Sequence, residues 1–314
     1  MQEGCKRKYF AAIDIGSNAV RMALAHLEGS SLQVIHSWRK FLRLGDDVFH
    51  SGKITEASLN ILQSTLESFV VSVKDYPEPD FSVIATSAMR DAENRQHVVS
   101  HIQKNLGLQI KTISGKEEAD YLLKAIQNCL SWGDDLVILA DLGGGSLEIS
   151  IMEGRRIVWQ KSLDCGVLRF SKLDAGSQQK YLESWKKELE QAFAQHAAHD
   201  SNLILTGGNA KVLSQLIQRQ ENRGPVNKMM HIPWQKFLQA KASIETYQPQ
   251  HYVKKGWLRP DQGEVLILSL LIFEQLGKLS QCRQLILPRI GLKESILLQR
   301  AQTLFPEKCL QLQI

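Results

Sequence analysis

The sequence predicts an α/β protein built from two domains, each with a mixed sheet and its own helices. Apolar, strand-like runs alternate with segments of helical periodicity, which is typical of layered α/β architecture. A strand that ends in aspartate and enters a turn of glycine and serine occurs twice, at Asp14 and at Asp141. The length of 314 residues suits two domains, each large enough to bury a core.

The chain opens with a predicted strand followed by a pair of antiparallel strands. An apolar run at residues 9–14 ends in aspartate, and residues 16–18 (Gly-Ser-Asn) follow it as a tight polar turn. Two more strands are expected at residues 19–27 and 32–36, because a glycine-containing turn separates two strand-like runs.

Helices and strands alternate through the rest of the first half. Apolar residues spaced by three and four predict a helix over residues 55–74, with Thr55 as its N-cap. The elements expected after it are a strand at 81–85, a helix at 91–105, a strand at 108–113 and a helix at 116–132.

The opening pattern then returns. A strand at residues 136–140 precedes Asp141 and a Gly-Gly-Gly-Ser turn, and strands at 148–152 and 157–162 follow. Because strand, turn and strand pair recur together, they indicate an internal repeat of a whole domain. We therefore expect domain I at residues 1–125 and domain II at 126–314, with a boundary inferred only from the repeat.

The remainder of domain II is predicted to be mainly helical. The helices expected are 171–196, 211–218, 233–246, 263–276 and a closing helix after residue 291, with strands at 202–205 and 284–287.

Composition restricts the function classes. Apolar and charged fractions of 43% and 23% are those of a soluble globular protein, and no apolar run reaches membrane-span length. Five scattered cysteines without a C-x-x-C pair favour a reducing cytoplasm and no zinc site, and Asp14 interrupts the apolar run that a secretory signal would need. The net charge of +5 is dispersed, which argues against nucleic acid as a partner.

The two aspartate-containing turns are where chemistry is expected. Backbone N–H groups of a glycine-rich turn can converge on phosphate oxygens, and a neighbouring carboxylate can hold Mg²⁺. A single turn of this kind is also typical of an ordinary hairpin. Two turns related by a domain repeat favour a pair that clamps one polyanion.

Four motifs occur in an order that resembles the exopolyphosphatase / guanosine pentaphosphate phosphohydrolase (Ppx/GppA) family, in its short two-domain form. They are Asp14-Ile-Gly-Ser-Asn18, Ala85-Thr-Ser-Ala-Met-Arg90, Ile113-Ser-Gly-Lys-Glu-Glu-Ala119 and Asp141-Leu-Gly-Gly-Gly-Ser-Leu-Glu148. The resemblance implies two actin-like ATPase (ribonuclease H-like) domains that flank a cleft. It also implies release of terminal phosphate from polyphosphate or guanosine pentaphosphate, and a homodimer.

The resemblance also implies catalytic roles. Glu118, the second glutamate of S-G-x-E-E-A, is expected to activate the attacking water, although helix N-terminal placement explains Glu117 and Glu118 equally well from sequence alone. Arg90 is expected to stabilise terminal phosphate charge through its planar guanidinium, with a surface ion pair as the alternative.

Carboxylates and turn residues complete the predicted site. Asp141 and Glu148 are the expected ligands of Mg²⁺ or Mn²⁺, with Asp14 as a further candidate. The alternative for Glu148 is an exposed position in the strand. Residues seven apart in an unbroken strand would lie on opposite faces, but the turn between Asp141 and Glu148 interrupts the strand and removes this restriction. The residues expected to bind phosphate are Ser17, Asn18, Arg21, Gly143, Gly144, Gly145 and Ser146. For Arg21, a cross-strand ion pair is the competing interpretation.

Three departures from the family pattern leave other functions open. Asp120, Gln262 and Lys293 stand where the family often has arginine. Fewer cationic groups along the substrate path would suit a short or nucleotide substrate, or a protein that senses polyphosphate or guanosine penta- and tetraphosphate without hydrolysis. A small-metabolite kinase of the same superfamily is the other alternative, since 206–209 (Thr-Gly-Gly-Asn) occupies the place of an adenosine pocket.

Overall fold

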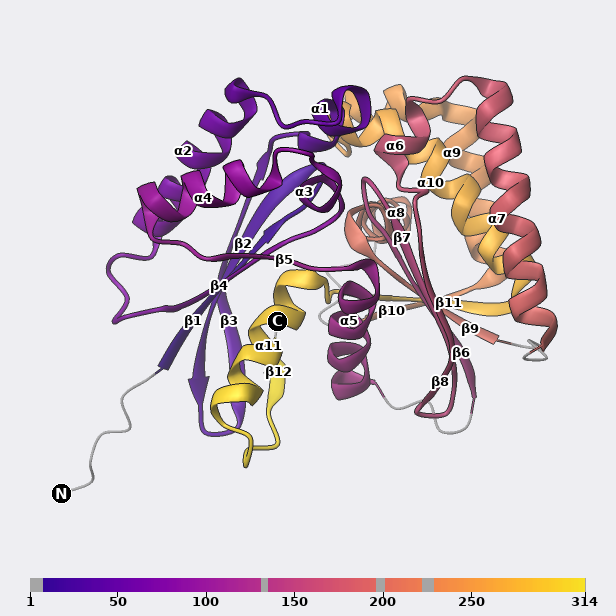
Figure 1. The fold of residues 1–314 in the computed structure, drawn as a ribbon. Coiled ribbons are helices and arrows are strands. Elements are labelled where there is room, and N and C mark those ends of the chain that lie inside the picture. The colour runs from indigo at the N-terminus through magenta and orange to yellow at the C-terminus, as the bar shows by residue number, and fades with distance from the viewer. Residues whose placement is uncertain (1–7, 131–134, 196–200, 222–228, 314) are drawn as a thin grey trace. The chain divides into compact units, whose positions relative to one another are not determined.

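A computed structural model describes residues 8–130, 135–195, 201–221 and 229–313 (Figure 1). The chain divides into two compact units. Unit 1 comprises Met1–Ser131 with Ile290–Ile314, and unit 2 comprises Trp132–Arg289. The last 25 residues of the chain thus belong to unit 1, whereas the sequence-based division put them in domain II. Chain order does not reveal that a terminal helix returns to the first sheet.

Unit 1 contains a mixed six-stranded sheet. Its strands in spatial order are β12 (Gln311–Gln313), β3 (Ser31–Phe41), β2 (Ala19–Glu28), β1 (Lys8–Ile15), β4 (Asp80–Ala85) and β5 (Ile110–Thr112). Strand β1 pairs antiparallel with β2 and parallel with β4. Strand β2 pairs antiparallel with β3, which confirms the strand pair predicted after the first turn. The carboxyl ends of β1 and β4 therefore lie at the same edge of the sheet.

The helices of unit 1 cover this sheet. They are α1 (Leu44–Ser51), α2 (Glu56–Ser72), α3 (Ser87–Asp91), α4 (Arg95–Leu106), α5 (Gly115–Cys129) and α11 (Leu292–Leu304). Ile13 and Met22 belong to the same buried cluster as Leu62 and Leu66 of α2. Helix α11 contacts β1, β2 and α5. The predicted cap of α2 is confirmed, because Thr55 Oγ1 accepts from the backbone N–H of Ser58 at 3.2 Å.

Unit 2 repeats the plan of unit 1. Its sheet runs in the order β10 (Met229–Pro233), β11 (Cys282–Pro288), β9 (Ser201–Thr206), β6 (Leu136–Leu142), β7 (Leu147–Glu153) and β8 (Arg156–Leu163). Strand β6 pairs antiparallel with β7 and parallel with β9, as β1 does with β2 and β4. The predicted internal repeat and the α/β class with mixed sheets are therefore confirmed.

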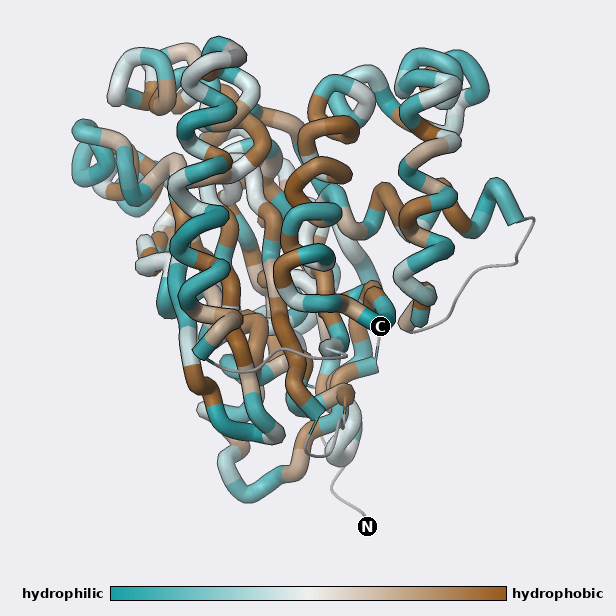
Figure 2. Tube along the Cα trace, turned by 90° about the vertical axis from the view of Figure 1, so that its right-hand side faces the viewer, coloured by the Kyte–Doolittle hydropathy of each residue, from teal (hydrophilic) through white to brown (hydrophobic). Residues whose placement is uncertain are grey.

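The helices of unit 2 are more numerous in its second half. They are α6 (Val167–Ser171), α7 (Ala175–Gln195), α8 (Gly207–Gln220), α9 (Trp234–Lys254) and α10 (Pro260–Leu279). Helix α9 is broken at Gln248 (φ 62°), directly before Pro249, whose ring is incompatible with helical geometry in the preceding residue. Figure 2 shows hydrophilic and hydrophobic residues mixed along the helices, as amphipathic packing requires. Within the described residues, every helix is too short or too polar to cross a membrane.

The predicted elements differ from the structure mainly in short segments. The helix expected at 91–105 corresponds to α4, which begins only at Arg95, because Ala92 is extended (φ −67°, ψ 123°) and ends the short helix α3 before it. Helix α1 and strands β10 and β12 were not predicted, since segments this short carry little periodicity. The ends predicted for two helices, at 132 and 196, lie outside the described residues.

Candidate active site

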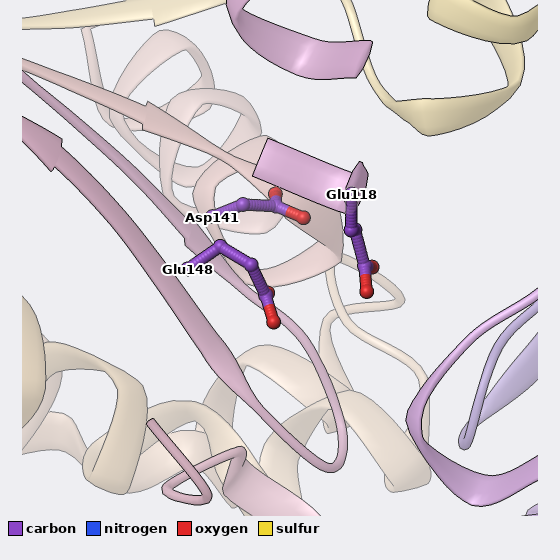
Figure 3. A group of neighbouring side chains, drawn as sticks. All are labelled: Glu118, Asp141 and Glu148. Carbon is purple, nitrogen blue, oxygen red and sulfur yellow. The ribbon is translucent and has the colours of Figure 1, made fainter. Parts of the chain in front are cut away.

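Asp141 and Glu148 form a pair of buried carboxylates in unit 2 (Figure 3). They are direct cross-strand partners in β6 and β7, and a carboxylate oxygen of each lies within 4.8 Å of one from the other. The turn between the strands thus brings a residue seven positions on to the same face as Asp141. Thr206 Oγ1 donates to Asp141 Oδ1 at 2.6 Å, and Ser162 Oγ donates to Glu148 Oε1 at 2.8 Å.

The glycine-rich turn beside this pair is held by helix α6. A hydrogen bond from Gly143 N to Ser146 O at 3.0 Å closes the turn. The carbonyls of Gly143 and Gly144 accept from the N–H groups of Val167 and Leu168, at 3.1 and 2.8 Å. Arg169 Nε donates to the carbonyl of Gly145 at 3.0 Å.

These carbonyl bonds orient the amides of the turn. In a planar trans peptide, the C=O of one residue and the N–H of the next point in opposite directions, and the described chain has no cis peptide. Three successive carbonyls face α6 and Arg169, so the N–H groups of Gly144, Gly145 and Ser146 face the other way. Successive N–H groups on one side of a turn form a concave anion-binding arrangement.

Two glycines allow this close packing. A Cβ on Gly166 would lie 2.3 Å from Gly145 N and 2.4 Å from Gly144 C, so the N-terminus of α6 approaches the turn backbone directly. At Gly207 the backbone has φ +91°, and a Cβ would lie 2.9 Å from Asp141 Oδ1. Both positions therefore require glycine, one for space and the other for conformation as well.

The corresponding turn of unit 1 carries a different pair. Asp14 and Arg21 are cross-strand partners in β1 and β2, and Arg21 Nη1 donates to Asp14 Oδ2 at 3.0 Å. A hydrogen bond from Gly16 N to Ala19 O at 3.2 Å closes this turn. The ion pair that the sequence left as an alternative for Arg21 is thus present.

Ser17 and Asn18 are fixed by neighbouring segments. Ser17 Oγ lies 2.7 Å from Ser87 Oγ and accepts from the N–H of Ala88 at 3.2 Å, so this hydroxyl anchors the turn to α3. The carbonyls of Ser17 and Asn18 accept from backbone N–H groups of residues 42–45. By the same peptide geometry, the N–H of Asn18 faces away from that segment.

Arg90 and Glu118 lie close together in unit 1. Arg90, near the end of α3, donates from Nη1 to the carbonyl of Ile113 at 3.0 Å, and the same nitrogen is 3.8 Å from Glu118 Oε2. Glu118 is buried in the first turn of α5. The guanidinium and the carboxylate that the sequence predicted are therefore neighbours.

The structure distinguishes Glu117 from Glu118. Glu117 forms a capping box with Ser114, accepting from the Ser114 backbone N–H at 2.9 Å, and pairs with Lys111 Nζ at 2.9 Å. The backbone hydrogen bond from Ser114, followed by the bond from Lys111, lowers the pKa of Glu117 to about 2. Glu117 is thus engaged in starting the helix, whereas Glu118 is placed beside Arg90.

Some contributors to the site were not predicted from sequence. Ser162, which donates to Glu148, follows no motif, because its place depends on the register between β7 and β8. Residues 206–209 were considered only as the place of an adenosine pocket, yet the hydroxyl of Thr206 bonds Asp141 because β9 lies parallel to β6.

The fold and the site define a two-unit α/β protein with a carboxylate pair and, beside it, a glycine-rich turn whose N–H groups face one way at the end of a strand in unit 2. The model of the Ppx/GppA phosphatase family matches residues 23–304, so the chain belongs to that family. This confirms the resemblance found in the motifs.

Individual relatives agree with this assignment. Exopolyphosphatase 1 of Mycobacterium tuberculosis is 33% identical over 140 residues, which cover 44% of this chain and 40% of that protein. Exopolyphosphatase 1 of Mycobacterium leprae is 30% identical over 139 residues, or 44% of this chain and 41% of that protein. These matches span well under half of each curated relative.

Solved structures share the fold over nearly the whole chain. An exopolyphosphatase from Cytophaga hutchinsonii superposes with a TM-score of 0.85 at 18% identity, covering 97% of this chain and 100% of that one. The Aquifex aeolicus member of the Ppx/GppA family gives 0.77 at 20% identity, covering 95% and 98%. At such identities the likeness establishes the fold alone.

Proposed function

We propose that this chain is a divalent-metal-dependent phosphohydrolase that releases terminal phosphate from inorganic polyphosphate, with guanosine pentaphosphate as a second substrate. The observation that carries the proposal is the juxtaposition in unit 2 of the Asp141–Glu148 pair with a turn whose N–H groups face one way. A turn of this kind suits phosphate oxygens, and two buried carboxylates suit a hard cation. Family membership and the exopolyphosphatase relatives support the same chemistry.

Asp141 and Glu148 would hold Mg²⁺ or Mn²⁺. Both are oxygen donors, both are buried, and both are oriented by hydroxyl groups, which fits the preference of these ions. Asp14 stays a further candidate ligand. When bound, the ion would neutralise charge on the phosphate oxygens during cleavage of the phosphoanhydride.

Glu118 would act as the general base. Its carboxylate would accept a proton from water as the water oxygen forms a bond to the terminal phosphorus and the bridging P–O bond breaks. Arg90, 3.8 Å from Glu118, would stabilise charge on the transferred phosphoryl group through its guanidinium. Unit 1 thus supplies the base and a fixed cation.

The two turns would position phosphate. In unit 2 the amides of Gly144, Gly145 and Ser146, with Gly143 closing the turn, would donate to phosphate oxygens. In unit 1 the backbone of residues 17–18 would do the same beside Arg21. We place the enzyme in the cytoplasm because its five scattered cysteines suit a reducing compartment; a homodimer stays a prediction of the family resemblance.

Phosphate release tests the proposal. The substrates are long-chain polyphosphate, tripolyphosphate and guanosine pentaphosphate, each with Mg²⁺ and with EDTA. We expect metal-dependent release, and the Glu118→Gln variant should lose about 10²- to 10⁴-fold in rate because a general base is removed.

Glu117→Gln is the matched control, since glutamine also fits the N3 position of a capping box. Its rate should stay within a few-fold of the native rate. Release that survives Glu118→Gln would exclude Glu118 as the base. Tight binding of polyphosphate with no release by the native protein would identify a sensor, and phosphorylation of a small metabolite from ATP would identify a kinase.

A further inference from the structure

The two repeated turns differ in one chemically decisive position. In each unit a strand ends in aspartate, a backbone hydrogen bond from the residue two positions later closes the turn, and the residue seven positions later is the cross-strand partner of the aspartate. That partner is Glu148 in unit 2 and Arg21 in unit 1. The same backbone position thus carries an anion in one unit and a cation in the other.

The charge balance of the two pairs follows from this exchange. Like charges directly opposite each other in antiparallel strands destabilise a sheet, and a cation held by the Asp141 and Glu148 carboxylates would relieve that repulsion. In unit 1 the Arg21 guanidinium already lies 3.0 Å from the Asp14 carboxylate. A divalent ion at Asp14 would have to displace this guanidinium or bind against the repulsion of its positive charge.

A second charge pair lies at the start of α11. Lys293 forms an ion pair with Glu294, whose carboxylate also accepts from the backbone N–H of Gly291 at 3.0 Å. Burial raises the pKa of Asp14, and Arg21 acts to lower it; Lys293 also lowers this pKa, whereas Glu294 raises it. Arg21 is therefore the cation bonded to this buried carboxylate, and the charges of Lys293 and Glu294 oppose each other.

We infer that the chain binds one divalent ion and that this ion binds in unit 2. In the first turn, Arg21 occupies the position that Glu148 occupies in the second turn. Its guanidinium supplies the positive charge beside Asp14 that a metal ion would supply beside Asp141. The inference rests on the proposed metal site, and it assigns Asp14 to the positioning of Arg21 for phosphate instead of to metal ligation. Arg21, held by Asp14, then offers its remaining N–H groups to a phosphate oxygen at the first turn.

The test counts metal ions without any substrate. Mn²⁺ is titrated into the native full chain, and bound ions are counted by electron paramagnetic resonance and by metal analysis after equilibrium dialysis. We expect one ion per chain. Asp141→Asn should weaken its affinity at least tenfold, whereas Asp14→Asn should change that affinity by less than about threefold.

Arg21→Glu is the decisive variant, because it gives unit 1 the same acidic pair as unit 2. It should raise the count from one ion to two, while Arg21→Gln should leave it at one. Circular dichroism and thermal unfolding establish which variants are folded. If Arg21→Glu does not fold, the native count and the Asp14→Asn affinity decide the question.

The inference would be overturned if the native chain bound two ions or none. It would also be overturned if the native chain bound one ion that is lost in Asp14→Asn and kept in Asp141→Asn. A folded Arg21→Glu variant that still binds a single ion would also overturn it. The metal titration does not depend on phosphate release, so its outcome can be distinguished from a failure of the hydrolase assignment.

Discussion

Two adjacent glutamates in the first turn of α5 have different surroundings. Glu117 is exposed and bonded to Ser114 and Lys111, while Glu118 is buried and lies beside Arg90. One residue therefore stabilises the start of the helix, and its neighbour lies beside the Arg90 guanidinium instead. The two positions differ by about 100° around the helix axis, which is enough to separate these roles.

The low pKa of Glu117 makes part of the stability pH-dependent. Its pKa is about 2 in the folded chain against a usual 4.5, so the stabilisation is complete above about pH 4.5 and is lost as the pH falls toward 2. We expect Glu117→Gln to lower the free energy of unfolding near neutral pH by no more than about 1 kcal/mol, since the ion pair is exposed. Denaturant titrations from pH 7 to pH 2 measure the difference between native and variant.

That difference should shrink steadily below pH 4.5. A gap that stays constant or widens toward pH 2 would contradict the assignment of the capping box as the origin of the low pKa.

At the residue scale, motifs in the sequence pointed to charged residues better than to the residues that hydrogen-bond to them. Asp141, Glu148, Arg90 and Glu118 could be named from motifs. The hydroxyl donor to Glu148 could not, because a partner in a neighbouring strand is fixed by register, and register is absent from a linear motif.

Helix α6 is the element that shapes the second turn. Its N–H groups bind the carbonyls of the turn, and Gly166 allows the two backbones to touch. The N–H groups on the other side of the turn are thus oriented by a helix of only five residues. Short helices of this kind escape sequence prediction, because so few residues carry little periodicity.

Gly166→Ala tests this role of α6. A Cβ would meet backbone atoms of Gly144 and Gly145, which cannot move aside as a flexible side chain would. We expect a loss of about 1–3 kcal/mol in the free energy of unfolding, as for other overpacked sites, and a clear loss of phosphate release. Denaturant unfolding and the phosphate assay measure the two effects.

Gly176→Ala in α7 is the matched control, because the nearest atom to its Cβ is a side-chain oxygen of Asp174 at 3.3 Å. It should change stability by less than about 1 kcal/mol and leave activity intact. Equal effects of the two substitutions would mean that α6 does not set the geometry of the turn.

At the scale of the whole chain, the repeat was predictable and the path of the carboxyl terminus was not. Each strand pair after a turn is local in sequence, so hydrophobic pattern and turn residues suffice to predict it. Helix α11 and strand β12 join unit 1 through contacts across most of the chain, including a bidentate pair from Arg300 to Asp80 at 2.9 and 3.0 Å. No local pattern encodes such a pairing.

The proposed function is the removal of phosphate from the end of polyphosphate with a divalent metal. The most direct measurement is ³¹P nuclear magnetic resonance of long-chain polyphosphate incubated with the native protein and Mg²⁺. We expect growth of the orthophosphate signal at the expense of internal phosphates, without an early rise in the signal of chain-end phosphates, and no change in EDTA. A rise in the chain-end signal before orthophosphate appears, release that persists in EDTA, or a spectrum that does not change would contradict the proposal.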